Sequence, residues 1–146
     1  MELQTSATGN GRPGRVLVVD DAAVVRRPIG MTLARAGYAV VEAESGEQAI
    51  KLVQNVRSPL TVDVVLCDIR MIRENGVETI TFFRQQHPMI PVVVLTAYQD
   101  IELAVSLMRQ GAFDFLVKPV LQDDLLTVVR KAVEQRAASQ DRVTST

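Results

Sequence analysis

The segment VDVVLCD, from Val62 to Asp68, decides the fold because its apolar residues are consecutive and it ends on a carboxylate. Consecutive apolar residues are typical of a strand that is buried on both faces, as in a parallel sheet. Four further runs have a similar character, namely RVLVVD (Arg15–Asp20), YAVVEA (Tyr38–Ala43), PVVVLTA (Pro91–Ala97) and DFLVKP (Asp114–Pro119). Together the five runs predict a central parallel sheet.

Helical patterns follow these runs. Ser45 and Gln48 indicate a capping box at the start of a helix whose apolar positions are Ala49, Leu52 and Val53. The next-to-last helix is expected to be capped by Asp100 and ended by Gly111, with an apolar face of Ile101, Ala104, Val105 and Met108. The last helix has the apolar stripe Leu125, Val128, Val129, Ala132 and Val133. Parallel strands need crossovers, so the pattern predicts a doubly wound α/β fold with right-handed connections.

Length and composition favour one globular domain. The chain has 146 residues, of which 47% are hydrophobic and 23% are charged, and single domains most often have about 100 to 150 residues. We expect a flexible N-terminal arm over residues 1–14, a domain over residues 15–136 and a polar C-terminal tail over residues 137–146.

Charge and hydropathy exclude several classes of partner. A net charge of −1 provides no basic face for direct contact with nucleic acid. No apolar run approaches the roughly 20 residues of a membrane helix, and the polar N-terminus does not resemble a secretory leader. The single cysteine, Cys67, is expected to be a buried small hydrophobe. We therefore expect a cytoplasmic protein without membrane or nucleic-acid contacts.

Polar residues gather where the predicted strands end. In open α/β sheets the ligand site lies at the carboxyl ends of the strands, and these ends have Asp20, Asp21, Asp68, Thr96 and Lys118. Three carboxylates brought together repel one another and require a counter-charge. Mg2+ prefers such oxygen ligands, whereas Zn2+ requires cysteine or histidine ligands that this chain scarcely has.

The same residues suit phosphoryl transfer. A carboxylate such as that of Asp68 can attack phosphorus to give an acyl phosphate. The charge on the transferring oxygens then needs a metal ion, a cation and hydroxyl donors. Lys118 and Thr96 have the required ammonium and hydroxyl groups.

Four motifs resemble the receiver domains of two-component response regulators. They are VVDD at Asp20–Asp21, CDIRMIRENG around Asp68, LTA at Thr96 and FDFLVKP through Lys118, and the similarity extends from Arg15 to about Arg136. The segment TAYQDIELAVSLMRQGAFDFLVKP is similar to receivers of NtrC-type regulators, which precede ATPase or DNA-binding output domains in other chains. The resemblance implies a flavodoxin-like (βα)5 fold with strand order 2-1-3-4-5.

The resemblance also implies roles for the residues of the site. Asp68 would be the phosphoacceptor, and Mg2+ would be held by Asp20, Asp21, Asp68 and the backbone carbonyl of Arg70. Lys118 would bind the phosphoryl oxygens. The protein would be a phosphoacceptor switch, with self-phosphorylation and autodephosphorylation as its only chemistry, and would not be an enzyme in the usual sense.

Switching and partners follow from the same resemblance. Thr96 and Phe115 would be the switch residues, while Arg70 and Tyr98 would tune the lifetime of the phosphoryl group. The donor would be a sensor histidine kinase or a phosphotransfer protein, and the output would go to a downstream effector protein or output domain. A phosphorylation-dependent homodimer is a further expectation.

Two positions depart from the family pattern. Ile72 stands where a proline usually follows the methionine after the phosphoacceptor, which leaves that loop less restricted. Pro28 falls inside the predicted first helix, a usual kinase-docking face in the family, where it removes a backbone hydrogen bond unless the helix starts late.

Three other functions have requirements that can be set against this sequence. A haloacid dehalogenase-type phosphatase would need an acidic residue two positions after Asp68, where this chain has Arg70. A flavodoxin-type flavin protein would need a Gly/Ser/Thr-rich loop where Asp20 and Asp21 stand. A receiver-like interaction module that works without phosphorylation stays open as the alternative.

Overall fold

The computed structural model describes residues 14–71 and 75–144, with side chains to residue 140. Its elements are, in chain order, β1 (Arg15–Val19), α1 (Ala23–Arg35), β2 (Ala39–Ala43), α2 (Gly46–Gln54), β3 (Val64–Asp68), α3 (Gly76–Gln86), β4 (Val92–Thr96), the 3-10 turn η1 (Tyr98–Asp100), α4 (Ile101–Arg109), β5 (Asp114–Val117) and α5 (Gln122–Thr144). The strands form one parallel sheet in the order β2-β1-β3-β4-β5. Both the doubly wound fold and the strand order are confirmed.

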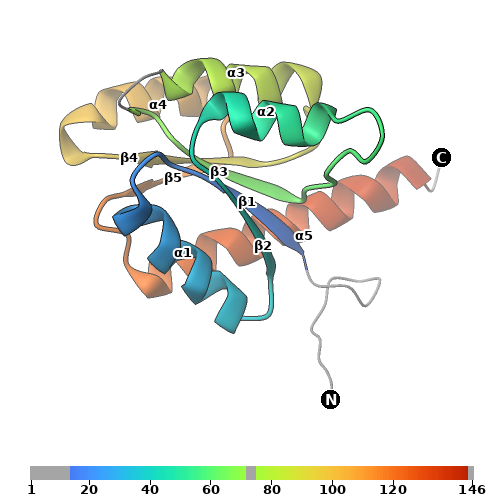
Figure 1. The fold of residues 1–146 in the computed structure, drawn as a ribbon, viewed down its shortest axis with the longest axis horizontal. Helices are drawn as coiled ribbons and strands as arrows, with labels where there is room; N and C mark the ends of the chain where they lie inside the picture. The colour runs from blue at the N-terminus through green and yellow to red at the C-terminus, as the bar shows by residue number, and fades with distance from the viewer. Residues whose placement is uncertain (1–13, 72–74, 145–146) are drawn as a thin grey trace.

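The sheet divides the interior into two hydrophobic cores (Figure 1). Helices α2, α3 and α4 cover one face, and α1 and α5 cover the other. Successive residues of β3 alternate between the cores, because Val65 and Cys67 belong to the first and Val64 and Leu66 to the second. Both faces are buried, which explains why the strand is apolar at consecutive positions.

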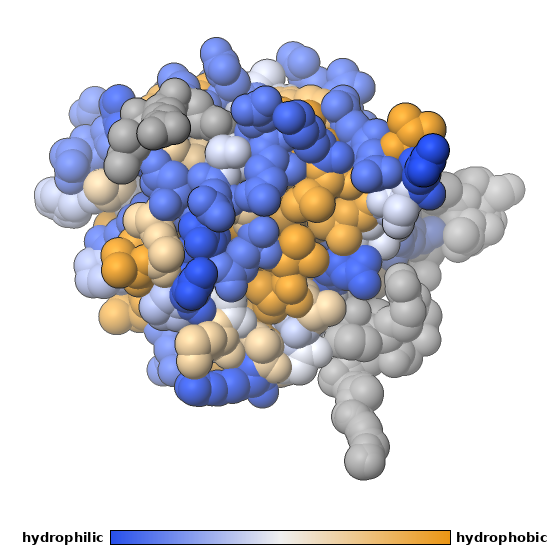
Figure 2. Space-filling view, in the orientation of Figure 1, coloured by the Kyte–Doolittle hydropathy of each residue, from blue (hydrophilic) through white to orange (hydrophobic). Residues whose placement is uncertain are grey.

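The two edge strands are less buried than the central ones. All residues of β3 and β4 are buried, whereas most residues of β2 and β5 are only partly so. On the face shown in Figure 2, hydrophobic residues gather near the β2 edge, where Val40 and Val41 are half-buried. The central strands therefore position the site most firmly.

Two predicted helix features are confirmed and two are wrong. Ser45 Oγ accepts a hydrogen bond from the Gln48 backbone N–H at 3.0 Å, and Gly111 follows α4 with φ 112°. Asp100 stands at the N-cap of α4 but makes no side-chain capping bond, because its carboxylate accepts from Arg70 Nε. Val105 is 38% exposed, since the sheet-facing residues of α4 are Ala104 and Leu107.

The first and last helices also differ from expectation. Helix α1 starts at Ala23 and contains Pro28 within it, so the alternative of a late helix start is wrong. Helix α5 continues to Thr144, well beyond the point at which we expected the polar tail to begin. The predicted arm, apart from Gly14, and the departure at Ile72 lie outside the described residues. Among the described helices, none combines the length and apolar character needed to cross a membrane.

Candidate functional site

The register of the sheet brings the polar strand ends to one edge. Val19 of β1 pairs with Cys67 of β3, so the next residues, Asp20 and Asp68, stand level on neighbouring strands. On the other side of β3, Thr96 ends β4 and pairs with Val117 of β5. Lys118, the next residue, donates its backbone N–H to the Thr96 carbonyl at 2.8 Å. The last residues of β3 and β4 and the residues just after β1 and β5 thus meet at this edge.

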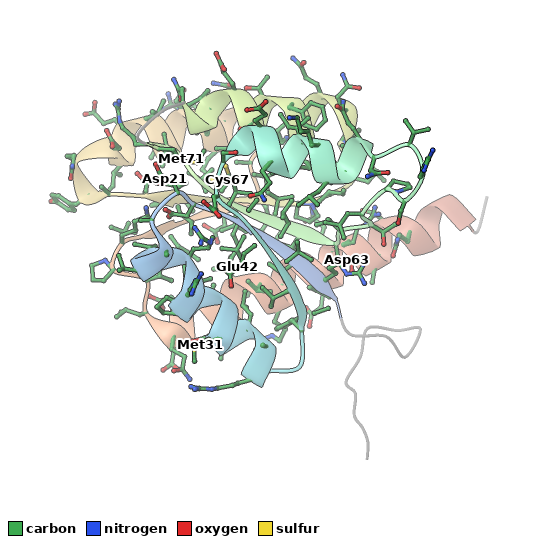
Figure 3. The ribbon with its side chains drawn as sticks, viewed as in Figure 1. Asp21, Met31, Glu42, Asp63, Cys67 and Met71 are labelled. Carbon is green, nitrogen blue, oxygen red and sulfur yellow. The ribbon has the colours of Figure 1, made fainter. Side chains whose placement is uncertain are left out.

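Three carboxylates form a compact cluster there. One oxygen from each of Asp20, Asp21 and Asp68 lies within 4.8 Å of the others. Asp20 is fully buried and Asp68 is 4% exposed. The Ala22 backbone N–H holds Asp20 Oδ1 at 2.9 Å, and the Arg70 backbone N–H holds Asp68 Oδ1 at 3.2 Å. Figure 3 places Asp21 at this edge and Asp63 at the opposite end of the sheet.

Lys118 joins the two buried carboxylates. Its Nζ lies 2.9 Å from Asp20 Oδ2 and 3.0 Å from Asp68 Oδ2. The Lys118 side chain is 22% exposed, so this ammonium is held at the mouth of the site. The predicted grouping of Asp20, Asp21, Asp68 and Lys118 is therefore present in the fold.

The surroundings of Asp68 disfavour the charged form of its carboxyl group. Burial raises the pKa of the Asp68 carboxyl above its ordinary value of 3.8, and the charge of Asp20 raises it further. Hydrogen bonds from Lys118 and from the Arg70 N–H oppose this rise. Burial alone would lower the pKa of Lys118, but the close Asp20 and Asp68 carboxylates outweigh burial, so this pKa is raised. The ammonium therefore stays charged between two carboxylates.

Comparison with known proteins identifies the family. The model of the response regulator receiver domain matches residues 16–130. The chain belongs to this family. Relatives of this receiver include the transcriptional regulatory protein GlrR of Escherichia coli K12, 35% identical over 130 residues, and the DNA-binding transcriptional regulator NtrC of the same strain, 38% identical over 120 residues. The matches cover 89% and 82% of this chain but only 28% and 25% of those relatives.

Solved receivers share the fold. The receiver domain of NtrX from Brucella abortus has a TM-score of 0.72 and 34% identity, over 82% of this chain and 98% of its own. A receiver domain protein from Clostridium thermocellum has a TM-score of 0.77 and 27% identity, over 84% and 96% of the two chains. This receiver thus matches whole solved receivers, but only about a quarter of the length of the curated regulators.

The donor set of this receiver fits a hard dication. The cluster has three carboxylates against the single ammonium of Lys118, which leaves an excess of negative charge. Asp20 Oδ2 is buried and, although it is ion-paired with Lys118, it has no well-directed hydrogen bond. An oxygen-only site with such an atom suits Mg2+. Cys67 faces the core under α2, α3 and α4, as predicted.

The other four predicted residues lie on or just after the strands β3, β4 and β5. Thr96 is fully buried, and its hydroxyl donates to the Ala97 carbonyl at 3.0 Å. Phe115 is half-buried on β5 and packs against the first core. Tyr98 is 79% exposed, and the Arg70 side chain reaches Asp100 at 3.0 Å. The Thr96 hydroxyl and the Arg70 guanidinium thus have partners outside the cluster, although the Arg70 backbone N–H contacts Asp68.

Sequence reasoning missed two residues of the site. Arg26 is 5% exposed, and its Nη1 donates to the Asp20 carbonyl at 2.8 Å. Its position three and seven residues before the buried Ile29 and Leu33 could have indicated a charge on the sheet-facing side of α1. Gly76 lies so close to Asp68 that a Cβ there would overlap the Asp68 carbonyl oxygen. A glycine at the start of α3, just after the loop that follows Asp68, could have indicated this close approach of two backbone segments.

Proposed function

We propose that this receiver accepts a phosphoryl group on Asp68 from the phosphohistidine of a sensor kinase or phosphotransfer protein, with Mg2+ as cofactor. The observation that carries the proposal is the contact of Lys118 Nζ with Asp68 Oδ2 at 3.0 Å, inside a cluster that includes Asp20 and Asp21. A nucleophilic carboxylate, an ammonium and a set of oxygen ligands are the parts that phosphoryl transfer needs.

Each residue then has a separate task. A carboxylate oxygen of Asp68 forms a bond to phosphorus while the bond from phosphorus to the donor imidazole breaks, leaving its electron pair on that nitrogen. Asp20, Asp21 and the Arg70 carbonyl would hold Mg2+, which supplies positive charge to the phosphoryl oxygens. Lys118 moves its hydrogen bonds from the carboxylate to the phosphoryl oxygens and so binds them.

The switch uses the residues around the cluster. The Thr96 hydroxyl leaves the Ala97 carbonyl and turns to the phosphoryl group, and Phe115 moves inward as space opens. The surface of α4, β5 and α5 then shifts in population between two states. Support comes from the positions of the two residues on neighbouring strands. Thr96 ends β4, and Phe115 of β5 pairs with Val94, two residues before Thr96.

Intact-mass measurement after incubation with acetyl phosphate, with and without Mg2+, tests the proposal. We expect a Mg2+-dependent phosphoryl adduct on the wild type that Asp68→Asn removes. Asp123→Asn is the matched control, because this residue is exposed in the first turn of α5, and it should keep the adduct. A wild type without an adduct would favour the alternative, an interaction module that works without phosphorylation.

The proposal extends to the partners of the phosphorylated receiver. A cytoplasmic receiver of this kind would signal to a downstream effector protein or an output domain, and its phosphorylated form would make a homodimer. Light scattering with and without beryllofluoride and Mg2+ measures the dimer directly. A monomeric mass in both conditions would contradict the proposed homodimer but would not affect the proposed phosphoacceptor role.

A further inference from the structure

Arg26 links three elements beneath the carboxylate cluster. It lies on α1, its Nη1 donates to the Asp20 backbone carbonyl at 2.8 Å, and its Nε donates to Glu42 Oε1 on β2 at 2.8 Å. Its own backbone N–H donates to the Ala22 carbonyl at 2.9 Å. The short connection between β1 and α1 is thus held at both ends by this one residue.

The Arg26 side chain is buried at this link, and its charge is paired there. The side chain is 6% exposed, while that of Glu42 is 34% exposed. Burying a guanidinium is unfavourable unless it is paired and hydrogen-bonded, and Glu42 supplies the pair. Figure 3 shows Glu42 on β2 on the α1 side of the sheet, with Asp21 at the end of β1.

We propose that Arg26 is a positioning residue that fixes the Asp20–Asp21 carboxylates in the geometry that binds Mg2+, with Glu42 as its anchor. The inference rests on the proposed Mg2+ site. Arg26 donates to the backbone carbonyl of Asp20, so it acts on the main chain that presents the ligands. Residues that orient metal ligands in this way typically change metal affinity by about 10- to 100-fold.

The sign of the effect distinguishes positioning from charge. If Arg26 acted only as a nearby cation, it would repel Mg2+, and its removal would tighten Mg2+ binding. If it positions the β1–α1 connection, its removal weakens binding although a repelling charge is lost. Arg26→Met therefore separates the two effects in one measurement.

The experiment measures Mg2+ affinity on the full chain by calorimetry and by backbone amide shifts of Asp21 and Ala22. We expect Arg26→Met to raise the Kd about tenfold. Arg27→Met is the matched control, because Arg27 is exposed on the same helix, and it should change the Kd by less than about twofold. Arg26→Lys keeps the charge but loses the forked donor, so it should also weaken binding.

A second variant tests the anchor. If both residues act through one link, Glu42→Gln added to Arg26→Met should raise the Kd no further. Circular dichroism establishes that each variant is folded, and Arg26→Lys keeps the test valid if Arg26→Met unfolds. A Kd for both Arg26 variants that equals or falls below that of the wild type would overturn the inference. A wild type that binds no Mg2+ would instead overturn the proposed function.

Discussion

Arg70 and Asp100 form an ion pair, with 3.0 Å between Nε and Oδ2, that joins the residues just after β3 to the turn before α4. The backbone N–H of Arg70 also donates to Asp68 Oδ1. One residue therefore contacts the proposed phosphoacceptor through its main chain and the start of α4 through its side chain.

Arg70→Ala should shorten the lifetime of phosphorylated Asp68 several-fold, because the guanidinium no longer restricts the approach of water. It should cost less than about 1 kcal/mol of unfolding free energy, since the Arg70 side chain is 70% exposed. Electrophoretic shift followed over time measures the decay. Arg109→Ala, at the exposed end of α4, is the control. Decay that is unchanged in both Arg70→Ala and Arg70→Ala/Tyr98→Ala would contradict a lifetime role for these side chains.

Lys118→Met should make the protein depend on Mg2+ for stability. It leaves Asp20 and Asp68 without their shared ammonium, at a cost of about 1–3 kcal/mol once partial exposure is taken into account. Thermal unfolding should show a larger Mg2+-induced rise in Tm in this variant than in the wild type. Lys51→Met, which breaks only an exposed pair with Glu47, should respond to Mg2+ as the wild type does. An equal rise in all three proteins would argue against Lys118 as the counter-charge.

Gly76→Ala should destabilise the fold by about 1–3 kcal/mol and slow phosphorylation of Asp68. The added Cβ would overlap the Asp68 carbonyl oxygen, and the nearby Ile69 carbonyl leaves little room to adjust. Gly30→Ala is an informative comparison, because its Cβ would meet side chains alone, the flexible Glu42 carboxylate at 3.2 Å and Val40 Cγ1 at 3.4 Å. That variant should be neutral or up to about 1 kcal/mol more stable, since alanine favours helix. If urea unfolding ranks the two variants in the opposite order, the backbone at Asp68 and Ile69 can move to accommodate the added Cβ.

Asp68→Asn should stabilise the metal-free protein at neutral pH. The folded-state pKa of Asp68 is raised, so this carboxyl favours the fold while protonated and loses that contribution as pH rises from about 3.8 through the folded pKa. Urea unfolding in EDTA should therefore show an advantage of Asp68→Asn near neutral pH that shrinks toward about pH 4. An advantage that is independent of pH, or a loss of stability at neutral pH, would mean that the carboxylate is well accommodated without metal.

The sheet and the carboxylate cluster could be predicted because both depend on strongly local patterns. Consecutive apolar residues define buried strands, and the strand ends share one edge whatever the helices do. Asp100 and Val105 were placed wrongly because each depends on tertiary context. The Asp100 carboxylate is ion-paired with Arg70, just after β3, and the sheet contacts α4 through Ala104 and Leu107.

The roles of Arg26 and Gly76 could not be predicted from local patterns, because they depend on contacts between residues far apart in the sequence. Arg26 acquires its role only when α1 packs beside β2 and Glu42 receives its guanidinium. Gly76 matters because a carbonyl eight positions earlier lies against it in space. The end of α5 was missed because the polar composition of its last turns does not stop a helix that begins on a well-packed apolar stripe.

The position of Lys118 after an edge strand has a consequence for how the protein is made. The carboxylates belong to the two central strands β1 and β3 and their ends, whereas the ammonium arrives with β5, the last strand of the chain and the outermost of the sheet. A nascent chain that has assembled only its first strands has these carboxylates but lacks the ammonium that pairs with two of them. The ammonium shared by the two buried carboxylates is therefore in place only once the last strand has docked.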